Sequence, residues 1–89
     1  MALVLICSDA KSAGNRYHGA NARIAKVLSD PPASWKAYEN AKDGLFSIIH
    51  MEHKELVRAK EDGTYHEIIE GLTHLAAACE HAISTMTCD

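Results

Sequence analysis

The chain has 89 residues, of which 47% are apolar and 24% are charged, as in an ordinary globular protein. This length allows one domain, residues 1–89, with a small hydrophobic core. A formal net charge of −3 excludes a strongly basic surface, and one Trp, one Phe and three Tyr are too few for a base-stacking platform. We therefore expect no nucleic-acid partner.

The cysteines and the apolar residues near the N-terminus indicate the cellular compartment in which we expect the protein. Cys7, Cys79 and Cys88 form no C-x-x-C pair, so we expect reduced thiols rather than a disulfide framework or a zinc ribbon. Residues 2–7 are apolar but too short for a signal sequence, and no stretch approaches the roughly 20 apolar residues of a membrane span. We expect a soluble, cytoplasmic protein in which this run, a brief strand or a helical turn, docks on the core.

Residues 15–28 contain apolar side chains at helical spacing, which predicts a small helix. Basic and aromatic side chains gather in the same stretch, and such a cluster could grip a phosphate. These candidate phosphate-binding residues are Arg16, Tyr17, Arg23 and Lys26. The alternative is a solvated helix face.

Pro31 and Pro32 end that helix and suit the first turn of the next one. The following pattern predicts a helix over residues 33–60, with a weak point at Asp43-Gly44. We expect either a kink there or two helices, 34–42 and 45–60. One face of this arm is apolar, yet it carries Glu52 near its centre, and a carboxylate is rarely buried unless it is paired or bound to a cation.

A turn is expected at residues 61–64, followed by a last helix that begins with the capping box Thr64-x-x-Glu67. The apolar seam predicted for this helix is Ile68, Leu72, Leu75, Cys79, Ala82 and Met86, widened by Ile69, Ala76 and Ile83. The alanines at 76–78 should let another helix approach closely. The fold class is therefore all-α: a short N-terminal segment, a small helix and a long antiparallel helical hairpin over about 33–86. Because this hairpin leaves an apolar face only partly covered, we expect a homo-oligomer.

Two pairs of acids, each spaced three apart, are the candidate metal ligands. They are Glu52 and Glu55 on the first arm, and Glu67 and Glu70 on the second. Such pairs on adjacent antiparallel helices can hold a hard cation such as Mg²⁺. However, Glu67 and Glu70 point away from the predicted seam, so another helix or subunit would have to help. The alternative is structural: Glu52 and Glu55 at a helix interface, paired with Arg23, Lys26 or Arg58, Glu67 as a cap, and Glu70 in solvent.

The stretch Met51-Glu-His-Lys-Glu-Leu56, a short turn, and then Glu67-Ile-Ile-Glu70 resembles the all-α nucleotide pyrophosphohydrolases of the MazG type. It is especially similar to their short phage and prophage members, which continue into an alanine-rich last helix. The resemblance covers residues 35–86. It implies a helical, oligomeric fold and Mg²⁺-dependent cleavage of a nucleoside triphosphate to monophosphate and pyrophosphate. Glu52, Glu55, Glu67 and Glu70 would then be the metal ligands, with Met51 in place of the family's leading glutamate.

Two functions remain open from the sequence. The chain is either such a hydrolase or a non-catalytic, phage-type binding protein that sequesters a nucleotide in the host cytoplasm or blocks a host defence protein. Glu67, Glu70, His74 and His81 should form a polar stripe on the last helix, facing solvent or another subunit. Cys79, on the predicted seam, should behave as a small apolar side chain.

Overall fold

The computed structural model describes residues 16–39, 41 and 43–87, and within them the secondary structure is entirely helical. The prediction of an all-α fold is therefore confirmed. The helices are α3 (His18–Ser29), the 3₁₀ helix η2 (Ala33–Tyr38), α4 (Gly44–Asp62) and α5 (Tyr65–Thr87). The expectations for residues 2–7, Cys7 and Cys88 lie outside the described residues.

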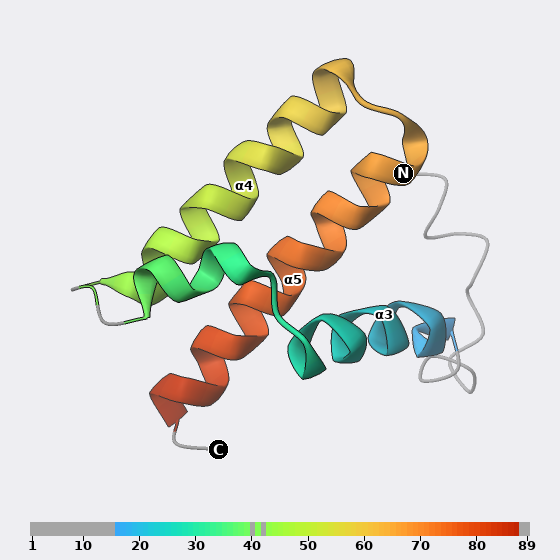
Figure 1. Cartoon of the computed structure of the whole chain (residues 1–89). Helices are drawn as coiled ribbons and strands as arrows, with labels where there is room; N and C mark the ends of the chain where they lie inside the picture. Colours follow the sequence, from blue (N-terminus) through green and yellow to red (C-terminus); the bar gives the residue numbers. More distant parts are fainter. Residues whose placement is uncertain (1–15, 40, 42, 88–89) are drawn as a thin grey trace.

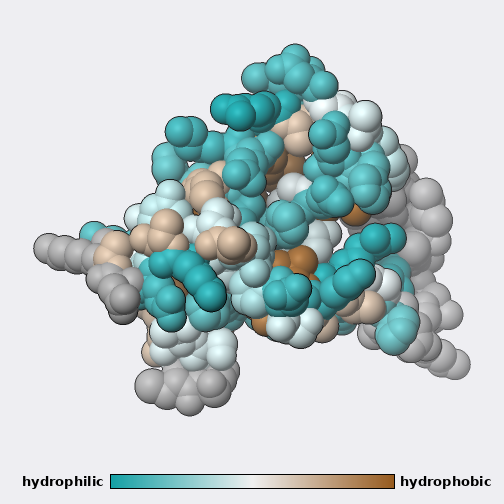
Figure 2. Space-filling model, viewed as in Figure 1, coloured by the Kyte–Doolittle hydropathy of each residue, from teal (hydrophilic) through white to brown (hydrophobic). Residues whose placement is uncertain are grey.

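Consecutive helices α4 and α5 pack side by side and run in opposite directions, while α3 packs on α5 and η2 on α4 (Figure 1). Trp35 of η2, Ile48 of α4, and Ala77 and Ala78 of α5 form the buried core. Three partly buried side chains of α3 pack against this core: Ile24, Val27 and Leu28. Each helix thus contributes to one small core. The surface seen from the same side is mostly hydrophilic, and its most hydrophobic residues, in brown, lie in recesses (Figure 2).

The break at Asp43-Gly44 is a true helix boundary. Asp43 adopts a left-handed conformation with φ of 61°, which aspartate tolerates better than most residues. Gly44 then begins α4 so close to η2 that a Cβ atom on it would lie 2.0 Å from the Tyr38 carbonyl oxygen. The sequence predicted one long helix with a weak point or two helices. The structure has two, and the first is a 3₁₀ helix.

The predicted seam of α5 is partly wrong. Ala82 is buried as predicted, but Leu72, Ile83 and Met86 are exposed. Ala77 and Ala78, which were not part of the seam, are buried instead. Helices α4 and α5 approach closely at Gly71, where a Cβ atom would lie 3.2 Å from the Leu56 Cα. Small side chains therefore define the packed faces of α5, because only they allow neighbouring backbones to come this near.

The capping box at the start of α5 forms as predicted. The Thr64 backbone N–H donates to Glu67 Oε1 at 2.8 Å, and the Glu67 N–H donates to Thr64 Oγ1 at 3.1 Å. The hydrogen bonds from Thr64, backbone first and then side chain, lower the pKa of the Glu67 carboxyl below its usual value.

Removing this cap should therefore cost stability in a pH-dependent way. Thr64→Ala is expected to lower the free energy of unfolding by about 1 kcal/mol. In Glu67→Gln only the charge is lost. Since the folded-state pKa of Glu67 lies below its unfolded-state value, its charge stabilises the protein above the unfolded-state pKa. That contribution disappears as the pH falls through the folded-state pKa. Urea unfolding of wild type and Glu67→Gln should differ near neutral pH and converge in acid; a difference that persists in acid would contradict this assignment.

Candidate functional site

Glu52, the acid on the apolar face of α4, is buried with 1% of its surface exposed. The indole N–H of Trp35 donates to its Oε2 at 2.7 Å. Its other oxygen, Oε1, accepts no hydrogen bond from a described residue, and His74 Nδ1 of α5 lies 3.8 Å from it. Glu52 therefore joins η2 to α4 inside the core, with His74 beside its second oxygen.

The other three predicted metal ligands lie elsewhere. Glu67 is engaged by the capping box. Glu70 is exposed, and its Oε2 lies 3.2 Å from Nε2 of His66, which is one turn earlier on the surface of α5. Glu55 is exposed and lines a groove of α4 described below.

Residues 16–39, 41 and 43–87 contain no group of three His, Cys, Asp or Glu side chains able to hold a metal ion. Mg²⁺ needs about six oxygen ligands at close range. Glu52 offers one buried oxygen, Oε1, which lies 3.8 Å from His74 Nδ1 and accepts no hydrogen bond from a described residue. As the described residues of one chain place them, these acids do not fit Mg²⁺. The structure instead bears out part of the alternative: Glu67 is a helix cap and Glu52 lies at a helix interface. The partner of Glu52 is Trp35, however, rather than Arg23, Lys26 or Arg58.

The two histidines of the predicted polar stripe, His74 and His81, lie in different environments. His74 is half-buried and turned toward Glu52, whereas the His81 ring lies 5.7 Å from the Trp35 ring. His81 also lines a large open cavity. Neither histidine therefore simply continues the surface pair of Glu70 and His66.

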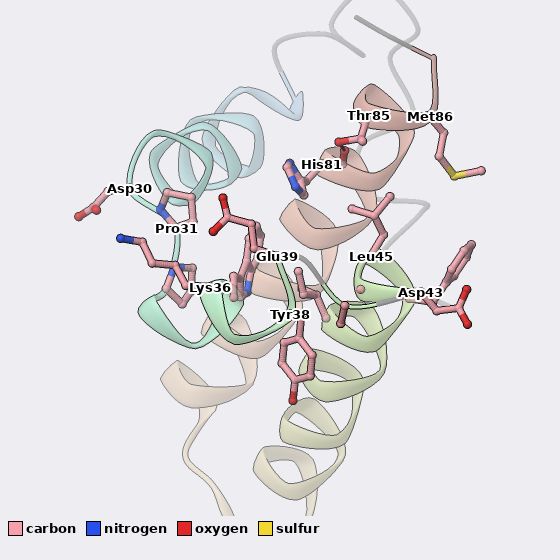
Figure 3. Close-up of a pocket in the computed structure, with 16 residues that line it drawn as sticks. Asp30, Pro31, Lys36, Tyr38, Glu39, Asp43, Leu45, His81, Thr85 and Met86 are labelled. Atoms are coloured by element: carbon pink, nitrogen blue, oxygen red, sulfur yellow. Dashed lines mark hydrogen bonds between the residues drawn. The ribbon is translucent and has the colours of Figure 1, made fainter.

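This larger cavity is open and has a volume of about 790 Å³, which lies within the range typical of small-molecule sites. Side chains from the loop before η2, from η2, from the start of α4 and from the end of α5 surround it (Figure 3). Its lining is mainly apolar, and the aromatic side chains among it are Trp35, Tyr38, Phe46 and His81.

Among the described residues that line the larger cavity, the charged side chains are mostly acidic: Asp30, Glu39 and Asp43, against Lys36. An excess of carboxylates repels an anion. The cavity therefore suits a neutral, flat group, such as an aromatic ring or a nucleobase, better than a phosphate.

A second, smaller groove of about 320 Å³ follows α4. His50, Lys54 and Arg58 line it at spacings of four, which places them on one face of the helix. Ser47 and Tyr38 add hydroxyl groups, while Glu55 is the one carboxylate among the described residues of this lining. Two fixed cations with hydroxyl donors are a suitable environment for a phosphate group.

Tyr38 lines both cavities, so the apolar cavity and the basic groove adjoin. The basic groove was not predicted, although the spacing of His50, Lys54 and Arg58 was its signal in the sequence. The predicted phosphate-binding residues Arg16, Tyr17, Arg23 and Lys26 are all exposed on or just before α3 and line neither cavity. There the Arg16 guanidinium stacks over the Tyr17 ring, 4.6 Å from its centroid.

No protein-family model, no curated protein and no solved structure matches this chain. In the part of the chain that the structure describes, no helix is long and apolar enough to cross a membrane.

Proposed function

We propose that this chain is a cytoplasmic, MazG-like helical protein that binds a nucleotide without hydrolysing it. One observation carries the proposal: an apolar, aromatic cavity and a basic groove meet at Tyr38. A nucleotide has the same two parts, a flat base and a charged phosphate chain. The base occupies the larger cavity beside Phe46 and His81, and the phosphates lie along Lys54 and Arg58.

The acids favour binding over hydrolysis. Cleavage of a phosphoanhydride in the MazG manner requires Mg²⁺ held by several carboxylates next to the phosphates. Glu52 is enclosed between Trp35 and His74, and Glu67 is held by Thr64. Glu55 is the one predicted ligand that lines the basic groove. A single carboxylate beside two cations supports phosphate binding rather than metal-assisted attack.

The test is a binding titration with a nucleoside, the corresponding mono- and triphosphates, and inorganic phosphate, each with and without Mg²⁺. A nucleotide at about 100 times its Kd should raise the free energy of unfolding by about 2.7 kcal/mol. Lys54→Ala combined with Arg58→Ala should weaken nucleotide binding by about 100-fold or more, because two charge-assisted hydrogen bonds are lost and each is worth about 1.5 kcal/mol or more. Binding of the nucleoside should change little.

Arg23→Ala combined with Lys26→Ala removes the same charge from α3 and is the matched control, so nucleotide affinity should stay near the wild-type value. Loss of binding in this control instead would move the phosphate site to α3. Release of pyrophosphate would show that the protein is a hydrolase. No binding of any nucleotide would refute the proposal and favour a protein partner.

A further inference from the structure

Helix α5 has one face that no other described helix covers. Helix α4 packs against the face with Gly71, Ala78 and Ala82, and α3 and η2 pack near Ala77 and His81. The remaining face carries seven residues whose spacing alternates between four and three. We call them the α5 seam: Tyr65, Ile69, Leu72, Ala76, Cys79, Ile83 and Met86.

The α5 seam has the pattern of a coiled coil. Residues that alternate four and three apart occupy the a and d positions of a heptad, which face a partner helix. All seven lie within about 100° of the helix circumference, given 3.6 residues per turn. None is charged, and Tyr65, Leu72, Ile83 and Met86 are 80%, 53%, 60% and 65% exposed. The other three, Ile69, Ala76 and Cys79, are half-buried. A heptad seam over three repeats that leaves four of its seven side chains exposed calls for another helix.

We propose that the α5 seam binds the α5 seam of a second copy of this chain, in an antiparallel arrangement with two-fold symmetry. Both helices then present the same surface, as a two-fold interface requires. Their macrodipoles also oppose one another, which favours the antiparallel orientation.

Side-chain volumes fix the register. When Leu72 meets the partner's Ala76, Ile69 meets the partner's Cys79. In the same register Ile83 meets the partner's Tyr65. The central layers then pair a large side chain with a small one, as close packing requires. A parallel pair would instead set Ala76 against Ala76 and Cys79 against Cys79, leaving two adjacent layers underfilled.

The residues flanking the α5 seam agree with this register. On one side Glu80 faces the partner's His66, and Thr73 faces the partner's Thr73. Glu80 and His66 are exposed in the single chain, with Glu70 already beside His66. On the other side Leu75 faces the partner's Leu75. A carboxylate therefore meets an imidazole on one flank and apolar side chains meet on the other, which is the complementarity that selects a partner.

The first test is sedimentation equilibrium over a range of protein concentrations, which should show a reversible monomer–dimer equilibrium. Leu72→Glu puts two charges into the central layers of the dimer and should raise the dissociation constant at least 100-fold. Because Leu72 is half-exposed, the helical circular dichroism of this variant should stay unchanged. Val57→Glu on α4 replaces another exposed apolar residue, 39% exposed, outside the α5 seam and is the matched control. It should dimerise as the wild type does.

The second test fixes the orientation by disulfide trapping. In a Cys7→Ser, Cys88→Ser background, Cys79 faces the partner's Ile69, so oxidation should give no covalent dimer. Adding Ile69→Cys should give one in high yield. Positions 69 and 79 of one helix are about 15 Å apart, too far for an internal disulfide.

Covalent dimer formed by Cys79 alone would show a parallel pair and overturn the proposal. A protein that stays monomeric at every concentration would also overturn it. The α5 seam would then be covered by the chain's own N-terminal residues or by a different protein. Dimers that survive Leu72→Glu would place the interface elsewhere.

Discussion

Replacing Gly44 with alanine is expected to destabilise the protein by about 3 kcal/mol, at the upper end of the usual cost of overpacking. A Cβ atom at this position would lie 2.0 Å from the Tyr38 carbonyl oxygen and 3.2 Å from its carbonyl carbon. Neither atom belongs to a side chain that could turn away, so η2 must separate from the start of α4. The shift moves Tyr38, which lines both cavities, and should weaken ligand binding together with stability.

Gly19→Ala in α3 is the control for this substitution. A Cβ atom on Gly19 meets nothing within 4 Å, so alanine should be neutral or stabilise the helix by up to about 1 kcal/mol. Urea unfolding followed by circular dichroism measures both variants. If the two substitutions changed the free energy of unfolding equally, the close contact between η2 and α4 would not be what stabilises this part of the fold.

The helix boundaries could be predicted because they depend on local chemistry. The capping box of α5 and the break at Asp43-Gly44 are encoded in a few consecutive residues, and both occur in the structure. The choice of packed face on α5 depends instead on neighbours distant in sequence. Apolar residues cover more than half of this helix, and periodicity gives Leu72 more weight than Ala77. In the structure other helices approach α5 closely where its side chains are small. Ala77 is therefore fully buried, while Leu72 is exposed.

The candidate site shows the same division. The position of Glu52 on an apolar face correctly indicated a carboxylate that needs a partner. The partner could not be identified, because Trp35 belongs to a 3₁₀ helix 17 residues away whose orientation depends on the left-handed turn at Asp43. A metal and a nearby arginine or lysine were the alternatives that sequence spacing offered. The structure shows an indole N–H, which satisfies one oxygen and leaves the other facing His74.

The substitution Glu52→Ala should therefore reduce stability as strongly as loss of a large core residue, by about 3 kcal/mol. It leaves the buried indole N–H of Trp35 without an acceptor, which costs about 1–3 kcal/mol, and it creates a cavity between η2, α4 and α5. Glu55→Ala, one turn further along α4 at an exposed position, should change the free energy of unfolding by less than about 0.5 kcal/mol.

Glu52→Gln separates the hydrogen bond from the charge. The glutamine side chain has the same shape, and its amide oxygen can accept from the Trp35 indole, so most of the stability should return. Urea unfolding of Glu52→Ala, Glu52→Gln and Glu55→Ala, each with and without a chelator, measures the effects. Two outcomes would contradict this role of Glu52: equal stability of Glu52→Ala and Glu55→Ala, or a loss of stability on adding the chelator that occurs in the wild type alone. Either result would make Glu52 a metal ligand rather than the hydrogen-bond acceptor that joins η2 to the core.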